Sequence, residues 1–319
     1  MQRAAPEHTP AAVHYRDADI RPDDVLVYHA AHASPLGAWL AEVEAVKIVD
    51  YHGITPPEFL RAYDPGLAVA LSKARAELEP LTAGATLGIA HSRYMERELQ
   101  AIGFRNTATL PLLVDPARLA GPPDVATAAR LRAGKRGHDL LFVSRMAPNK
   151  RIEDLLKVFA VYRRAWDRDA RLFVVGRPDT RAYVEALQRF AGRLGVEEVH
   201  FAGRVSDREL AAYYASADVF VSMSEHEGFG LPWVEAMAFG LPVIAYAAGA
   251  LPETVGDAGI LFTEKRYEDV AALVDAVVGD PALRARLAAA GRERVAAFGP
   301  AQFEARVHQL FGAWFQPAA

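Results

Sequence analysis

The sequence predicts an α/β protein with two doubly wound parallel sheets. Short apolar runs rich in β-branched residues alternate with stretches of helical periodicity through most of the 319 residues. The alternation stops around Gly121-Pro122-Pro123 and then resumes, and the chain is long enough for two cores. We therefore predict an N-terminal domain over residues 1–125, a second domain over 138–299 and a final helix in 300–319.

In the first domain, residues 1–24 contain three prolines and no strand-like run, so we expect them to be irregular. The apolar runs that follow predict strands at Asp24–Tyr28, Val46–Tyr51, Thr86–Ala90 and Thr107–Leu113. Helices are predicted at Pro57–Tyr63, at Pro65–Leu81, and from the N-cap Ser92 to Ala101, with Gly103 as the stop.

We expect the polar residues up to Gly137 to form an irregular linker. The predicted strands of the second domain are Asp139–Ser144, Arg171–Val175, Val199–Ala202, Val219–Ser222, Val243–Ala245 and Ile260–Phe262. The predicted helices are Ile152–Ala165, Arg181–Leu194, Asp207–Ala215, Trp233–Phe239, Tyr267–Val278, Pro281–Phe298 and Ala301–Phe315. Ser206 and Glu209 form a capping-box pattern, and Asp280 is an N-cap.

Composition and charge exclude several classes of protein. There is no cysteine, so disulfides and thiolate metal sites are excluded. The net charge is −4, and residues 1–125 hold 11 Lys and Arg against 16 Asp and Glu, which argues against nucleic acid and anionic lipid as partners. No apolar run reaches the length of a transmembrane segment, and the acidic N-terminus does not resemble a signal peptide. We expect a cytoplasmic protein.

A glycine-rich turn joins an apolar strand to a helix in the second domain. Gly228 and Gly230 let the backbone turn where a side chain would clash, and the proline that follows suits a first helical position. Backbone N–H groups at such a helix start favour an anion, typically phosphate. Two carboxylates, Glu227 and Glu235, bracket the turn. Taken alone, such a pair is more often a pair of surface residues.

From Glu227 to Val243 the sequence reads E-G-F-G-L-P-x-x-E-A-M-A-x-G-x-P-V. This string resembles the signature of the retaining glycosyltransferases of family 4, the group 1 glycosyltransferases, and is far more specific than a lone Gly-x-Gly. The resemblance implies the GT-B fold, in which two Rossmann-like domains face a cleft and the final helix crosses back to the first domain. It also implies transfer of a hexose from a UDP- or GDP-sugar to a hydroxyl of a sugar or lipid-linked acceptor, with retention, and peripheral membrane association is common in such enzymes.

The resemblance gives roles to individual residues. Arg145 and Lys150 stand where the family has the cations that hold the donor diphosphate. Glu227 resembles the residue near the donor sugar, and Glu235 the one that accepts hydrogen bonds from the donor ribose. His52 resembles the histidine that faces the donor sugar across the cleft. Each has a plainer alternative: a basic loop, a favourable charge at a helix N-terminus, or a structural histidine.

Further donor contacts are implied for loops of the second domain. The positions that would meet the nucleotide base are Gly176, Arg177, Arg204 and Val205, and those of the turn are Gly228, Phe229, Gly230 and Leu231. His226 is left out of this set, since in an extended chain it would point away from its neighbour Glu227.

We predict no metal ion and no cofactor besides the donor substrate. Asp167-Arg168-Asp169 has the letters of a metal-binding Asp-x-Asp, but it lies between a helix and an apolar strand and is better explained as a solvated turn. Arg145, Lys150 and the helix start after Gly230 would carry the positive charge instead.

The first domain departs from the family pattern. No glycine precedes Gly37 and about four strands are predicted, so the glycine-rich first unit of a typical member has no counterpart. This leaves open a non-catalytic nucleotide-sugar-binding or scaffold protein. An epimerase or phosphorylase of the same fold is disfavoured by the combined motifs. An incomplete sheet would also expose an edge that a second copy could cover, which makes a homodimer a hypothesis.

Overall fold

The structure is a computed structural model that describes residues 13–115, 119 and 121–312. Its strands are β1 (Val25–Ala30), β2 (Val46–Tyr51), β3 (Leu87–Ala90), β4 (Thr107–Thr109), β5 (Asp139–Val143), β6 (Arg171–Val175), β7 (Val199–Gly203), β8 (Val219–Ser222), β9 (Val243–Tyr246) and β10 (Ile260–Phe262). Its α-helices are α1 (Leu36–Glu42), α2 (Pro65–Ala76), α3 (Arg93–Ile102), α4 (Val125–Ala133), α5 (Ile152–Ala165), α6 (Arg181–Arg193), α7 (Asp207–Ser216), α8 (Leu231–Ala238), α9 (Leu251–Val255), α10 (Tyr267–Gly279), α11 (Pro281–Ala296) and α12 (Pro300–Phe311). In these ranges no helix has the length and apolar character that a membrane crossing requires.

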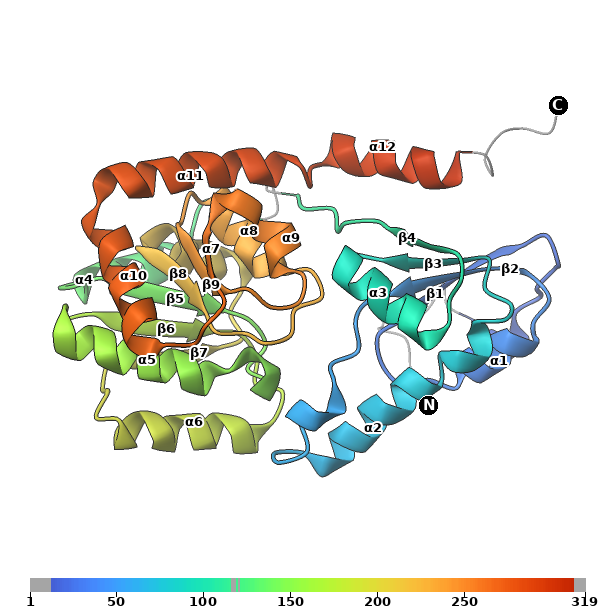
Figure 1. Ribbon diagram of the computed structural model, residues 1–319, viewed down its shortest axis with the longest axis horizontal. Coiled ribbons are helices and arrows are strands. Elements are labelled where there is room, and N and C mark those ends of the chain that lie inside the picture. The colour runs from blue at the N-terminus through green and yellow to red at the C-terminus, as the bar shows by residue number, and fades with distance from the viewer. Residues whose placement is uncertain (1–12, 116–118, 120, 313–319) are drawn as a thin grey trace.

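The strands form two separate parallel sheets, as predicted (Figure 1). The N-terminal sheet has the order β1-β2-β3-β4, which is also the order along the chain. Because parallel crossovers are right-handed, a sheet that grows in one direction places all its connecting helices on one face. The main core of this domain lies under α1, α2 and α3 and contains Tyr51, Met95, Leu99 and Phe104.

The opposite face of the N-terminal sheet is contacted by the end of α12. Phe311 packs near Ile48 and Ile89, and Arg306 Nε donates a 2.9 Å hydrogen bond to the carbonyl oxygen of Thr109. Figure 1 shows α11 and α12 running in succession from the second domain to the first. On this face of β1, Val27 remains 52% exposed. The last predicted helical residues, 313–315, and residues 1–12 lie outside the described ranges.

The C-terminal sheet has the order β10-β9-β8-β5-β6-β7. The strand order reverses between β5 and β8, which are hydrogen-bonded neighbours although they are far apart in sequence. In doubly wound sheets, ligands bind beyond the carboxyl ends of the strands at such a switch point. Any site should therefore be sought where the chain leaves β5 and β8.

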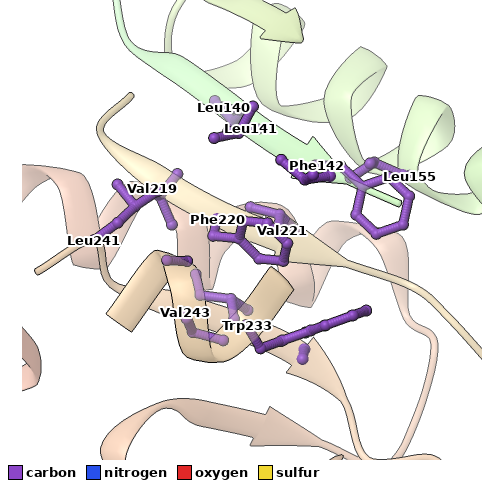
Figure 2. Close-up of a cluster of buried hydrophobic side chains, with 14 of the residues drawn as sticks. Leu140, Leu141, Phe142, Leu155, Val219, Phe220, Val221, Trp233, Leu241 and Val243 are labelled. Carbon is purple, nitrogen blue, oxygen red and sulfur yellow. The ribbon is translucent and has the colours of Figure 1, made fainter. Parts of the chain in front are cut away.

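The core of the second domain is built on the two central strands. Leu140 and Phe142 of β5, Phe220 of β8 and Trp233 of α8 are fully buried, and Figure 2 shows their side chains gathered between the strands and the helix. A strand buried on both faces reads as a continuous apolar run, which is why periodicity located β5 and β8 well.

Several predicted elements are wrong in detail. The linker expected up to Gly137 contains α4, which packs against α7 and buries Leu131. The expected helix Pro57–Tyr63 is a single 3₁₀ turn at Pro57–Phe59, and the helix from Pro65 ends at Ala76, before a separate 3₁₀ turn at Glu79–Leu81. Helix α1 has no counterpart among the predictions. Strand β4 is shorter than predicted and ends at Thr109.

Candidate functional site

Two loops meet at the switch point of the C-terminal sheet. The loop after β5 ends in a 3₁₀ turn, Pro148–Lys150, and the loop after β8 carries Glu227. The backbone N–H of Glu225 donates to the carbonyl oxygen of Asn149 at 2.9 Å, and Asn149 Nδ2 donates to the carbonyl oxygen of His226 at 3.1 Å. The register of β5 against β8 therefore brings together the two motifs singled out from the sequence.

Lys150 and Glu227 form an ion pair in this position. The distance between Lys150 Nζ and Glu227 Oε2 is 2.7 Å, and the two side chains are 9% and 7% exposed. Lys150 Nζ also donates to the carbonyl oxygen of His226 at 3.3 Å. The other carboxylate oxygen of Glu227, Oε1, is buried without a hydrogen-bond partner. A buried acceptor without a donor costs free energy, so a hydroxyl or N–H of a ligand placed there would be stabilised.

The backbone of the loop after β8 is held at successive residues. The carbonyl oxygen of Glu227 accepts from the N–H of Ala250 at 2.9 Å, and that of Gly228 accepts from Ser92 Oγ at 2.6 Å. The carbonyl oxygen of Phe229 accepts from Thr254 Oγ1. The loop is thus fixed by two domains at once, which keeps Glu227 in one orientation.

Helix α8 starts immediately after this loop. Gly230 has φ 92°, and a Cβ there would lie 2.8 Å from Leu251 Cδ2, so both conformation and space call for glycine. The helix begins at Leu231, two residues earlier than predicted, with Pro232 in its second position rather than its first. Glu235 consequently lies beyond the first turn and is buried, and its Oε2 accepts a 2.9 Å hydrogen bond from Tyr214 OH. The explanation of Glu235 as a helix-terminus charge is therefore wrong.

The remaining predicted donor residues lie at the ends of the strands on one side of β5. Arg145 is exposed and its Nη1 lies 2.6 Å from Asp179 Oδ2. Gly176 has φ 138°, and a Cβ there would lie 1.9 Å from the carbonyl oxygen of Ser144. Arg177 and Arg204 are exposed and Val205 is half-buried at the ends of β6 and β7. These residues share one edge of the sheet, and Arg145 forms its ion pair with Asp179 and not with Glu227, whose partner is Lys150.

Arg151, next to Lys150, belongs to a separate ion-pair network. It has φ 49°, and its guanidinium lies 3.2 Å from Glu225 and 3.3 Å from Asp154. Burial alone would raise the pKa of Asp154, but hydrogen bonds from Lys157 and Lys265 outweigh burial and hold it at about 2. This network fixes the start of α5 directly behind the loop of Lys150.

The first domain reaches the loop after β8 through the start of α3. A Cβ built on Gly228 would lie 2.7 Å from Met95 Sδ, and one built on Gly53 would lie 3.2 Å from Met95 Cε. The side chain of Met95 therefore lies between the loop that carries His52 and the loop that carries Glu227. The side chain of His52 itself lies against Asp50 and His29, and its role opposite the donor sugar stays a prediction.

His226 also lies at this contact. Its ring is buried against Tyr94 with centroids 5.9 Å apart, and its Nε2 has no hydrogen-bond partner. Burial, reinforced by the positive charges of Lys150, Arg75 and Arg145, lowers the pKa of His226 to about 4. The imidazole is therefore neutral at neutral pH.

Some residues at the site escaped the sequence predictions. Asn149, Tyr214 and Ser92 contact the loop or Glu235, yet the motifs gave none of them a role at the site. Asn149 could have been found from its place beside Lys150. Tyr214 could not, because it comes from α7, a helix that carries no site motif.

Comparisons with solved structures establish the class of fold. The chain superposes on Anabaena Alr3699/HepE in complex with UDP and glucose with a TM-score of 0.70, at 22% identity, covering 84% of this chain and 72% of that one. It superposes on sucrose-phosphate synthase from Thermosynechococcus elongatus with a TM-score of 0.72, at 25% identity, covering 91% of this chain and 73% of that one. Together with the two parallel sheets, these similarities define a GT-B fold.

Sequence comparison then identifies the family. The model of the glycosyl transferases group 1 matches residues 127–294, which is more than half of the chain, and the chain belongs to this family. The prediction made from the string around Glu227 is confirmed at this level.

Two relatives show how much of each chain is similar in sequence. The chain is 34% identical over 194 residues to the GDP-mannose-dependent alpha-(1-6)-phosphatidylinositol monomannoside mannosyltransferase of Mycolicibacterium smegmatis, covering 57% of this chain and 50% of that protein. It is 35% identical over 188 residues to a D-inositol 3-phosphate glycosyltransferase of Streptomyces avermitilis, covering 56% of this chain and 40% of that protein. The chain spans about half the length of the curated relatives it matches.

Proposed function

We propose that this chain transfers a hexose from a UDP- or GDP-sugar to a hydroxyl acceptor, with retention at the anomeric carbon and without a metal ion at the diphosphate. The observation that carries the proposal is the buried Lys150–Glu227 pair at the switch point, beside the start of α8. This position is where a parallel sheet of this kind binds nucleotides.

The charges of the site suit a leaving diphosphate. Lys150 and Arg145 follow β5, and the N–H groups at the start of α8 add partial positive charge. On this proposal, Glu227 Oε1 accepts a hydroxyl of the donor sugar and Glu235 accepts the ribose hydroxyls. His52 faces the sugar from the first domain.

The chemical step needs no enzymic nucleophile. The bond between the anomeric carbon and the diphosphate oxygen breaks, and the bond to the acceptor oxygen forms on the same face. The acceptor proton passes to the leaving diphosphate. The catalytic contribution of the protein is then positioning and charge stabilisation.

The test is a calorimetric titration with UDP and with GDP in the presence of a chelator. We expect one of the two nucleotides to bind to the wild type, and Glu235→Gln to weaken that binding more than 10-fold, since a charged hydrogen bond contributes about 1.5–3 kcal/mol. Glu185→Gln, which changes a half-buried glutamate of α6 that is paired with the exposed Arg181, is the matched control. If neither nucleotide binds, the proposal is wrong for this chain.

Catalysis is tested separately from binding. The relatives named above act on inositol-containing acceptors, so we propose a sugar or lipid-linked hydroxyl as the acceptor class. Transfer to such an acceptor, with the anomeric configuration of the product read by NMR, supports the enzyme. The described part of the N-terminal sheet has four strands against six in the other, and this favours one alternative, a nucleotide-sugar-binding scaffold. Nucleotide binding without any product would select that alternative.

The oligomeric state belongs to the same proposal. In the described residues β1 forms one edge of the N-terminal sheet, and Val25 on it is 51% exposed. An open edge strand favours pairing with another chain, so a homodimer is expected at high concentration. The homodimer would be excluded if light scattering gives the mass of a monomer at every protein concentration.

A further inference from the structure

Neighbouring strands bring four polar side chains to one edge of the N-terminal sheet. His29 lies directly opposite Asp50 in the β1–β2 register, and Asp50 lies opposite Ile89 of β3. His52 and His91 follow Asp50 and Ile89 by two residues each. Because side chains alternate along a strand, all four are directed to the face that α1, α2 and α3 leave uncovered.

Three of these side chains bring their ligand atoms together. Asp50 Oδ2 lies 2.8 Å from His29 Nδ1 and 3.1 Å from His52 Nε2, and the two imidazole nitrogens are 3.0 Å apart. A tetrahedral ion with metal–ligand distances of about 2.0–2.1 Å holds its ligand atoms roughly 3.3 Å apart. The triangle of atoms is therefore only slightly smaller than one face of such a tetrahedron.

The fourth side chain leaves a pair of buried acceptors without a donor. His91 Nδ1 lies 3.1 Å from the carbonyl oxygen of Leu110, an acceptor, so the ring proton belongs on Nδ1. The bare Nε2 then faces Asp50 Oδ1 at 3.4 Å, and both atoms are buried without a hydrogen-bond partner. His91 itself is 7% exposed. Two facing lone pairs in a buried position indicate that positive charge is needed at this cluster.

We propose that His29, Asp50 and His52 bind one divalent transition-metal ion of the Zn²⁺ type. Two imidazoles and one carboxylate suit Zn²⁺, whereas Mg²⁺ and Ca²⁺ prefer oxygen ligands throughout. His91 is a positioning residue, because its ring packs edge-to-face against the imidazole of His52 with centroids 4.9 Å apart.

Three protein ligands leave the fourth position of the ion open. Asp50, His52 and His91 line a cavity of about 440 Å³ whose other walls are mainly apolar, including Ile48 and Ile89. An ion with an open position beside an apolar cavity is typical of sites that bind or polarise a small molecule, rather than of structural sites.

This site goes beyond the proposed function and departs from the prediction that the chain binds no metal ion. That prediction rested on the missing Asp-x-Asp and concerned the donor diphosphate. The ion would occupy Nε2 of His52, the residue proposed to face the donor sugar. His29→Gln removes an ion ligand and leaves His52 in place, so that the two roles can be measured apart.

The experiment is a titration of the chelator-treated full chain with Zn²⁺, followed by calorimetry and metal analysis. We expect one ion per chain, and we expect His29→Gln and Asp50→Asn each to weaken binding more than about 100-fold, because even outer partners of a ligand contribute about 10–100-fold. His91→Gln should weaken it about 10-fold. His200→Gln, which changes the exposed histidine paired with Glu198, is the matched control.

A second readout distinguishes a bound ion from a hydrogen-bonded cluster. Co²⁺ in place of Zn²⁺ should give the visible absorption of a four- or five-coordinate ion in the wild type and lose it in His29→Gln, while circular dichroism shows both chains folded. Absence of stoichiometric Zn²⁺ binding by the wild type, or equal binding by His29→Gln and His200→Gln, would overturn the proposal. Nucleotide binding in chelator is expected to persist in His29→Gln, Asp50→Asn and His91→Gln, so that a failure of the metal site can be distinguished from a failure of the proposed function.

Discussion

Ser92 Oγ donates a 2.6 Å hydrogen bond to the carbonyl oxygen of Gly228, a residue 136 positions later and in the other domain. The same hydroxyl accepts the N–H of Met95 at 3.2 Å and thereby caps α3. One side chain thus starts a helix of the first domain and holds the loop of Glu227 in the second.

We predict that Ser92→Ala loosens this loop. Removing the cap costs about 1 kcal/mol of unfolding free energy, and the loss of the bond to Gly228 should raise hydrogen–deuterium exchange over residues 225–231. Ser206→Ala removes a similar N-cap on α7, far from the loop, and should cost similar stability without that local exchange. Equal exchange in the two variants would show that Ser92 acts only as a cap.

The Lys150–Glu227 pair makes a prediction about stability. Lys150→Met leaves a buried carboxylate unpaired and should lower the unfolding free energy by about 3–5 kcal/mol in urea denaturation. Adding Glu227→Gln should restore much of the loss, because the uncompensated charge is then removed. The control variant Lys73→Met breaks the surface ion pair between Lys73 and Glu77. Because the side chain of Lys73 is 71% exposed, this variant should change the unfolding free energy by less than about 1 kcal/mol. If the losses of unfolding free energy in the two single variants simply add in the double variant, Lys150 and Glu227 are not directly coupled.

Gly176 should not tolerate a side chain. Gly176→Ala combines a φ of 138° with a Cβ 1.9 Å from Ser144 O, and we expect it to lower the melting temperature clearly by displacing the backbone between β5 and β6. Gly192→Ala, in α6 with nothing near its Cβ, should instead stabilise by about 0.5–1 kcal/mol. A neutral Gly176→Ala would mean that the loop after β5 moves freely.

His226 makes stability depend on pH. Its folded pKa of about 4 lies below the ordinary value of 6.5, so protonation favours the unfolded chain. The stability that the neutral His226 contributes is fully present above pH 6.5. As the pH falls towards 4 this contribution is lost, which lowers the unfolding free energy by up to about 3 kcal/mol. Urea denaturation across this range should show a steeper loss for the wild type than for His226→Gln. If the unfolding free energies of the two proteins fall in parallel with pH, the side chain of His226 is accessible to solvent and its pKa is not lowered.

Sequence periodicity predicted the elements that have a strong apolar pattern. The bounds of β2, β6, β8, β10 and α5 match the prediction because buried strands and an amphipathic helix leave strong patterns. Helix α4 was missed because it buries little beyond Thr127 and Leu131, although its N-cap Asp124, which accepts the N–H of Thr127, was a usable signal. Helix α1 follows Pro35 without a side-chain cap and spans seven residues, so periodicity had little to act on.

The sequence could predict which residues lie at the ends of strands near the candidate site. It could not predict which of these residues contact one another. Lys150 and Glu227 were found from motifs, yet their direct pairing depends on β5 lying beside β8, which no local pattern specifies. The cluster of His29, Asp50 and His91 was missed for the same reason. Its members are 21 and 41 residues apart along the chain, and only the register of three strands joins them.

The contact of α12 with the N-terminal sheet has a consequence for biosynthesis. Arg306 donates a hydrogen bond to Thr109, which precedes it by 197 residues in the sequence. Phe311 packs against a sheet whose strands are encoded more than 200 residues before it. A ribosome that adds about 5–20 residues per second needs ten seconds or more to bring that helix out after the sheet has emerged. Throughout that interval the nascent first domain exposes an apolar surface, which makes it a client for chaperones until translation of α12 is complete.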